Sequence, residues 1–127
     1  MQTTKVKAAL LILVLTGLSG SAWAAGKTER VQFEAGKSSA TVVGTVTGYD
    51  TANYLLGATS GQVISVLFAA DNNACYFNFV EPGAPSAIHM GEVAGNEYAA
   101  KLNVSGDNRI EVYLMRSEAR RGKTCKF

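Results

Sequence analysis

Turn-forming residues recur along most of the chain at intervals of roughly 8 to 14 residues, with short alternating segments between them. The clearest alternation lies in residues 109–115, where Ile110, Val112 and Leu114 share one face of an expected strand. This spacing is typical of antiparallel sandwiches and barrels, in which each strand needs one apolar face and a tight turn before the next strand. The sequence therefore predicts an all-β fold, a small antiparallel β-sandwich of about 7–8 strands.

Eight segments have the composition of strands. They are residues 31–34, 41–47, 53–58, 62–69, 75–79, 87–90, 97–102 and 109–115. Beyond the N-terminal segment, no stretch has a convincing helical period. Residues 117–121 suit a single helical turn, which would place Arg116 and Arg120 on the same face because they are four residues apart.

The N-terminal segment has the three parts of a secretory signal peptide. Lys5 and Lys7 form a basic start, an apolar run follows over residues 8–18, and Ala22-Trp23-Ala24 is a small-x-small cleavage site. The apolar run is shorter than the roughly 20 residues that cross a bilayer, so we expect no membrane anchor after cleavage. The expected division is a signal peptide over residues 1–24 and one domain over residues 25–127.

Charge is segregated along the expected mature chain. Removing Lys5 and Lys7 leaves ten basic residues against ten acidic ones, so the net charge of +2 falls to zero and does not support nucleic-acid binding. Residues 109–127 nevertheless hold six basic and two acidic side chains. A basic patch at one end of a neutral protein indicates a specific acidic partner.

Cys75 and Cys125 both lie in the exported part of the chain. An even number of cysteines in an oxidising compartment favours a structural disulfide, which would close a loop of about 50 residues and stabilise the fold by roughly 4 kcal/mol. Two free thiols and a redox role are the alternatives, although the spacing differs from Cys-x-x-Cys.

Catalytic chemistry is sparse. The sequence has one histidine, His89, which we interpret as a surface or half-buried residue near a strand end. If the two cysteines are bridged, a zinc site lacks ligands, and no motif supports a nucleophile–base pair around His89. Ten carboxylates would allow a glycosidase-like pair by number, but none lies in a suggestive context. We therefore expect a non-enzyme without cofactor or metal.

The remaining polar features suit binding. Tyr49 lies in a turn, from which it can project or cap the core, and Ser105-Gly106 forms a second tight turn. The arginine cluster comprises Arg116, Arg120 and Arg121. These arginines either form a solvated loop that pairs with acids such as Glu118, or contact the carboxylates of an acidic cleft, for which guanidinium geometry is well suited.

Several of these motifs recur in one order along nearly all of the expected mature chain. They are Gly48-Tyr49-Asp50, Tyr54, Ala58, Gly61-Gln62, Tyr76-Phe77-Asn78, Pro82-Gly83, Ser105-Gly106 and Val112-Tyr113-Leu114-Met115-Arg116-x-x-Ala119-Arg120-Arg121. In this respect the chain resembles the periplasmic bacterial inhibitors of invertebrate-type and goose-type lysozymes, and the terminal run is the most specific part. The resemblance implies a periplasmic β-sandwich that inserts loops into the lysozyme active-site cleft. It implies Tyr49, Ser105, Gly106, Arg116, Arg120 and Arg121 as contacts.

The chain departs from that family at two places. Members directed at invertebrate-type lysozyme often have a tyrosine where this chain has Asn108, and its loss removes an aromatic contact. Similar chains also continue with a full strand after the arginine loop, whereas this sequence ends at Phe127. Either the expected disulfide anchors a short terminal segment, or a sheet edge is left unpaired.

A second resemblance belongs to another functional class. Tyr54, Gly61-Gln62, the apolar strand after them, and the later Pro-Gly, Ser-Gly and Val-Tyr pairs are similar to pre-peptidase C-terminal sandwich modules. Such an exported module would bind glycan or peptidoglycan, but it does not call for an arginine cluster. A purely structural envelope protein is the third reading. Binding to lysozyme or to peptidoglycan separates the three, and the sequence leaves both a monomer and a homodimer open.

Overall fold

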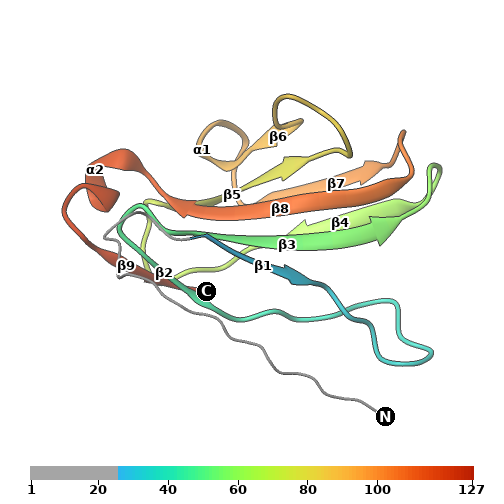
Figure 1. Ribbon diagram of the computed structural model, residues 1–127, viewed down its shortest axis with the longest axis horizontal. Coiled ribbons are helices and arrows are strands. Elements are labelled where there is room, and N and C mark those ends of the chain that lie inside the picture. The colour runs from blue at the N-terminus through green and yellow to red at the C-terminus, as the bar shows by residue number, and fades with distance from the viewer. Residues whose placement is uncertain (1–25) are drawn as a thin grey trace, which may run out of the picture.

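The computed structural model describes residues 26–127, so the signal peptide expected over residues 1–24 lies outside the described residues. The main layer is a five-stranded sheet in the order β1-β3-β8-β5-β6 (Figure 1). Its strands are β1 (Gly26–Arg30), β3 (Thr51–Ala58), β5 (Cys75–Val80), β6 (His89–Met90) and β8 (Gly106–Leu114). The other strands form two ladders, β2 (Thr45–Thr47) with β9 (Thr124–Lys126), and β4 (Val63–Leu67) with β7 (Glu97–Lys101). Two short helices are α1 (Gly91–Ala94) and α2 (Arg116–Ala119).

One face of the sheet packs against both ladders, which makes the fold a two-layer, all-β structure as the sequence predicts. Alternate residues of β5 and β8 point inward, among them Phe77 and Phe79, both 0% exposed, and Val112, 2% exposed. Val46 and Cys125 of the β2–β9 ladder are buried in the same cluster. Side chains of β4 and β7 pack against it from the other ladder. Burial of this apolar face is the main source of stability.

Three features of the fold differ from the expectation. The first strand is β1, not residues 31–34, and it pairs with β3 in parallel, so the sheet is not purely antiparallel. All five residues of β1 are exposed, and an edge strand without a buried face carries no apolar pattern to detect. The expected strand at residues 41–47 shortens to β2. The helix α1 was not expected, because four residues are too short to show a helical period.

The predicted disulfide is confirmed. Cys75 and Cys125 are bonded, and both are buried, at 3% and 0% exposure. The strand β9 pairs in antiparallel register with β2, and two backbone hydrogen bonds of 3.0 Å between Gly44 and Phe127 extend that ladder. The terminal segment is therefore paired and covalently anchored, which is the first of the two alternatives left by the sequence.

Removing the disulfide should destabilise the fold. We expect the double variant Cys75→Ala/Cys125→Ala to lose roughly 4 kcal/mol of unfolding free energy, because the unfolded chain regains the entropy of an open loop. Denaturant unfolding of the variant and the wild type measures the difference. The wild type in reductant provides the control and should approach the variant. A change below about 1 kcal/mol would contradict this account.

Candidate functional site

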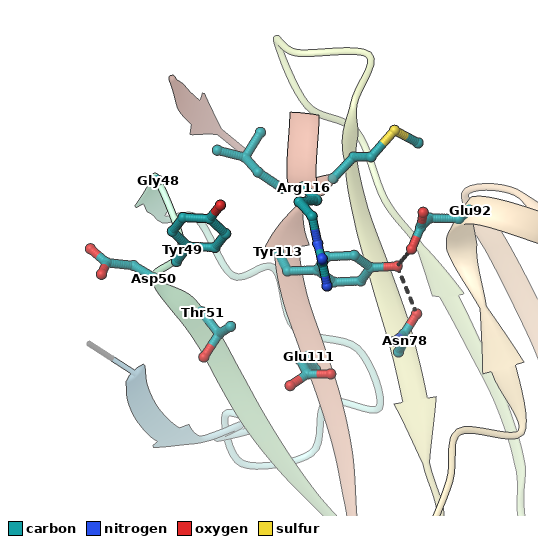
Figure 2. Close-up of a pocket in the computed structure, with 11 residues that line it drawn as sticks. Gly48, Tyr49, Asp50, Thr51, Asn78, Glu92, Glu111, Tyr113 and Arg116 are labelled. Atoms are coloured by element: carbon teal, nitrogen blue, oxygen red, sulfur yellow. Dashed lines mark hydrogen bonds between the residues drawn. The ribbon is translucent and has the colours of Figure 1, made fainter. Parts of the chain in front are cut away.

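A hollow of about 550 Å³ opens on the outer face of the sheet, where β8 ends and β3 begins (Figure 2). It is lined by Gly48, Tyr49, Asp50, Thr51, Asn78, Glu92, Glu111, Tyr113, Leu114, Met115 and Arg116. These residues come from the β2–β3 turn, from β5 and β8, and from the starts of both helices. The hollow thus combines two residues predicted as contacts, Tyr49 and Arg116, with a polar floor.

Tyr49 is presented by a tight turn. The Asp50 backbone N–H donates to the Thr47 carbonyl at 3.0 Å, and Gly48 adopts a φ of +60°, which favours glycine. The Gly48 N–H also donates to the Lys123 carbonyl at 2.8 Å, so the turn is joined to the loop between α2 and β9. Tyr49 is 56% exposed, and therefore it projects from the surface and does not cap the core.

The arginine loop leaves β8 directly. The Met115 N–H donates to the Ala74 carbonyl at 2.8 Å, and the Arg120 N–H donates to the Arg116 carbonyl at 2.8 Å, which closes the helical turn expected near residues 117–121. Both of these arginine side chains are exposed. Among residues 26–127, neither makes a side-chain hydrogen bond or ion pair. Arg121 differs, because its Nη1 lies 3.6 Å from Glu118 Oε2.

The floor of the hollow is a hydrogen-bonded group of Tyr113, Glu92 and Asn78, which we call the Tyr113 clasp. The Tyr113 hydroxyl lies 2.7 Å from Glu92 Oε2 and 3.3 Å from Asn78 Oδ1, and Figure 2 shows it between these two side chains. Burial, followed by the hydrogen bond to Glu92, raises the pKa of Tyr113 well above the ordinary value for a tyrosine. The phenol thus stays protonated and holds α1 on the sheet.

Ser105 and Gly106 lie elsewhere. They are at the opposite end of β8, which has nine residues, so roughly 27 Å separate them from the hollow. Ser105 Oγ accepts a 2.7 Å hydrogen bond from the Ser60 N–H, which ties the β7–β8 turn to the β3–β4 turn. A Cβ at Gly106 would come within 3.3 Å of Pro82, and its φ is +131°. The structure does not bring these two residues together with Tyr49 and the arginines.

Asn108 and His89 are both buried. Asn108 is 0% exposed and its Nδ2 lies 3.4 Å from the carbonyls of Leu56 and Gly106, so this position offers no contact to a partner. The interpretation of His89 as a surface or half-buried residue was wrong, because it is only 5% exposed. Its ring lies 4.8 Å from that of Phe77, and its Nε2 is 3.0 Å from the Gly95 carbonyl. His89 is buried because α1 and β7 cover the strand β6 that carries it.

Sequence reasoning missed Glu92 and Asn78. Glu92 lies in no motif, and Asn78 belongs to the Tyr76-Phe77-Asn78 motif without a contact role predicted for it. Only the folding of α1 over β5 and β8 brings the two to the hollow. A Cβ at Gly91 would lie 2.6 Å from the Phe77 carbonyl oxygen, so this glycine permits the close approach. Within residues 26–127, no group of three His, Cys, Asp or Glu side chains could hold a metal ion. No helix in that range is long and apolar enough to cross a membrane.

Comparison with known proteins identifies the family. The crystal structure of Aeromonas hydrophila PliG, a periplasmic lysozyme inhibitor of g-type lysozyme, superposes with a TM-score of 0.73 and 36% identity over 80% of this chain and 91% of that one. The chain belongs to the family of periplasmic inhibitors of g-type lysozyme. This agrees with the resemblance noted in the sequence.

Two further relatives of the family support this assignment. Salmonella Typhimurium PliG superposes with a TM-score of 0.59 and 28% identity, covering 79% of this chain and 93% of that one. The inhibitor of g-type lysozyme from Escherichia coli (strain K12) is 29% identical over 130 residues, which cover 100% of this chain and 95% of that protein. No protein-family model matches the chain. These relatives are inhibitors of an enzyme and not enzymes, in agreement with the prediction.

The Tyr113 clasp makes stability depend on pH in the alkaline range. Because the folded-state pKa of Tyr113 is raised, its contribution is complete below the ordinary pKa of about 10 and is lost as the pH rises above that value. We expect Tyr113→Phe to be less stable at neutral pH by about 1 to 2 kcal/mol, and to lose stability less steeply above pH 10. Denaturant unfolding between pH 7 and about 11 measures both effects.

Tyr49→Phe, which removes an exposed phenol, serves as the control for that series. Equal alkaline slopes for Tyr113→Phe and the wild type would show that the clasp with Glu92 does not retain its proton.

Proposed function

We propose that this chain is a periplasmic inhibitor of goose-type lysozyme that occludes the active-site cleft with the end of the sheet bearing Tyr49, Arg116 and Arg120. The observation that carries the proposal is the pair of exposed guanidinium groups of Arg116 and Arg120, which have no partner within residues 26–127. Arg116 also lines the same hollow as the exposed Tyr49. Membership of the inhibitor family gives these groups an acidic target. Export by the expected signal peptide would place the protein in the same compartment as the named relatives.

The mechanism needs no chemistry on the part of the inhibitor. Glycoside hydrolysis depends on carboxyl groups that must meet the sugar, so a lysozyme cleft presents acids at its base. Guanidinium groups form bidentate, charge-assisted hydrogen bonds with carboxylates. Arg116 begins α2 and Arg120 is the residue that caps its C-terminus, four positions later, so both would enter the cleft from one face, and Tyr49 would contact its wall. Substrate is then excluded and the catalytic acids are occupied.

Arg121, Ser105 and Gly106 have weaker claims as contacts. Arg121 is placed on the same loop but shares a carboxylate with its own chain. The Ser105-Gly106 turn lies at the far end of β8, so a single cleft could reach it only if the partner spanned the whole strand. Burial of Asn108 leaves that end without the aromatic contact of members directed at invertebrate-type lysozyme. These placements favour the goose-type enzyme as the target.

Inhibition of cell-wall lysis by goose-type, invertebrate-type and chicken-type lysozymes tests the proposal. The mature protein from residue 25 should inhibit the goose-type enzyme at near-stoichiometric concentration. It should inhibit the other two types much less. Light scattering of the complex distinguishes a monomeric inhibitor from the homodimer that the sequence leaves open. If folded protein inhibits none of the enzymes but binds peptidoglycan, the glycan-binding reading replaces this proposal.

Arginine variants test the contact residues. If the guanidinium group of Arg116 or Arg120 meets a buried carboxylate, substitution with alanine should cost about 2 to 5 kcal/mol of binding free energy, mostly through faster dissociation. Surface plasmon resonance with immobilised goose-type lysozyme measures the rates. Tyr49→Ala should also weaken binding, whereas Ser105→Ala should not.

Lys101→Ala is the matched control, because it removes an exposed cation from the β4–β7 ladder. If both arginine variants lose less than about 1 kcal/mol of binding free energy, the two residues lie at the solvated rim of the interface, and the proposal that they enter the cleft is wrong.

A further inference from the structure

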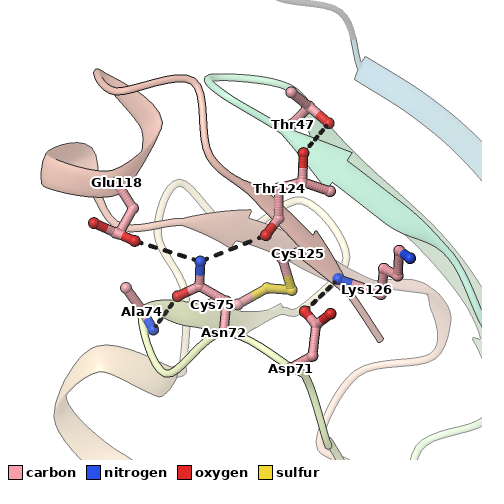
Figure 3. The surroundings of a disulfide bond; sticks show 9 residues. All are labelled: Thr47, Asp71, Asn72, Ala74, Cys75, Glu118, Thr124, Cys125 and Lys126. Atoms are coloured by element: carbon pink, nitrogen blue, oxygen red, sulfur yellow. Dashed lines mark hydrogen bonds between the residues drawn. A yellow bond between two sulfur atoms is a disulfide. The ribbon is translucent and has the colours of Figure 1, made fainter.

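Three segments converge behind the arginine loop. They are α2, the strand β9, and the loop of residues 68–74 that leads into β5 (Figure 3). Asn72 stands at the meeting point. Its Oδ1 accepts a 2.9 Å hydrogen bond from the Ala74 N–H, and its Nδ2 lies 3.4 Å from Glu118 Oε1 and 3.5 Å from the Thr124 carbonyl. One amide side chain thus links its own loop, the helix and the last strand.

Glu118 is the second part of this connection. One carboxylate oxygen faces Asn72, and the other lies 3.6 Å from Arg121 Nη1. The Glu118 carbonyl accepts hydrogen bonds of 3.1 Å from the backbone N–H groups of Arg121 and Lys123. Only 22% of the Glu118 side chain is exposed. Both its side chain and its backbone therefore fix the course of the loop between α2 and β9.

The carboxylate of Glu118 does not pair with the guanidinium groups of Arg116 and Arg120. Glu118 is two residues from both Arg116 and Arg120, a spacing that does not face side chains toward one another on a helix. Its carboxylate is instead engaged by Asn72 and Arg121. The loop contains no other carboxylate between residues 115 and 124. The guanidinium groups of Arg116 and Arg120 therefore stay available to a partner.

We propose that Asn72 and Glu118 are positioning residues for inhibition: they brace the arginine loop against the disulfide-bonded base, and Glu118 retains Arg121 so that only Arg116 and Arg120 meet the target. The disulfide supports the same base, since the Cys75 N–H donates to the Asn72 carbonyl at 3.1 Å and Thr124 directly precedes Cys125. This inference rests on the proposed function. In this proposal Asn72 and Glu118 raise the affinity for lysozyme by positioning the arginine loop, without contacting lysozyme themselves.

The test compares Asn72→Asp with Asn73→Asp. The first change keeps the acceptor for the Ala74 N–H but removes the donor and places a carboxylate against Glu118, whereas the second adds the same charge at an exposed neighbouring position. We expect Asn72→Asp to raise the Kd for goose-type lysozyme by roughly tenfold and Asn73→Asp to change it by less than about twofold. Equal effects of the two variants would overturn the inference.

A double-mutant cycle separates positioning from general destabilisation. In an Arg116→Ala/Arg120→Ala background, Asn72→Asp should change the Kd by less than about twofold, because the residues through which it acts are gone. Additive effects would overturn the inference. Glu118→Gln should follow the pattern of Asn72→Asp, and Arg121→Ala should weaken binding far less than Arg116→Ala. If Arg121→Ala weakens binding as much as Arg116→Ala does, Arg121 contacts the target and is not held away from it by Glu118.

Hydrogen exchange provides a readout that does not depend on lysozyme. Asn72→Asp should speed exchange at the backbone amides of residues 118–123 and leave the amides of β3 and β8 unchanged. Faster exchange throughout the sheet would show a structural role only and overturn the inference. If the wild type does not bind lysozyme at all, the proposed function falls, and exchange in the free protein still decides whether Asn72 and Glu118 hold the loop.

Discussion

The disulfide between Cys75 and Cys125 is the constraint on which the arginine loop depends. Cys75 lies opposite Leu114, the last residue of β8, in the β5–β8 register. The loop that carries the arginines starts directly after Leu114 and ends at β9, which holds Cys125. One covalent bond therefore fixes both ends of the loop to the same position on the sheet. Hydrogen bonds hold the rest of β9, through the three-residue ladder with β2 and through the Asp71 and Asn72 segment.

The site depends on local charge placement and not on net charge. The expected mature chain is neutral, yet the guanidinium groups of Arg116 and Arg120 stand exposed at one end of the sheet, without partners in the part of the chain that the structure describes. Acids nearby are engaged: Glu92 accepts from Tyr113, and Glu118 lies between Asn72 and Arg121. Charges that contact a partner directly interact strongly with it, because salt screens mainly those charges that lie more than a Debye length apart. This arrangement suits the recognition of a particular acidic cleft.

The two ends of the central strand β8 carry different features. At its end, Arg116 and Tyr49 face outward beside the hollow. At its start, Ser105 braces the neighbouring turn and Asn108 faces the interior. Strand geometry explains this division, since a nine-residue strand places its termini far apart however close their motifs lie in the sequence. The motif after residue 104 is thus partly structural, and its other part carries the residues that we propose as the binding surface.

The sequence by itself determined the all-β class, most strand faces, and the identity of the residues at the arginine end. The period-two pattern of residues 109–115 and the even number of cysteines are local signals, and the fold follows both. The tertiary structure alone decided the parallel pairing of β1, the burial of His89 and Asn108, and the clasps around Tyr113 and Glu118. These features arise from contacts between residues far apart in the chain. A local pattern carries no record of them, because an exposed edge strand or a polar side chain looks the same in sequence whichever segment comes to cover it.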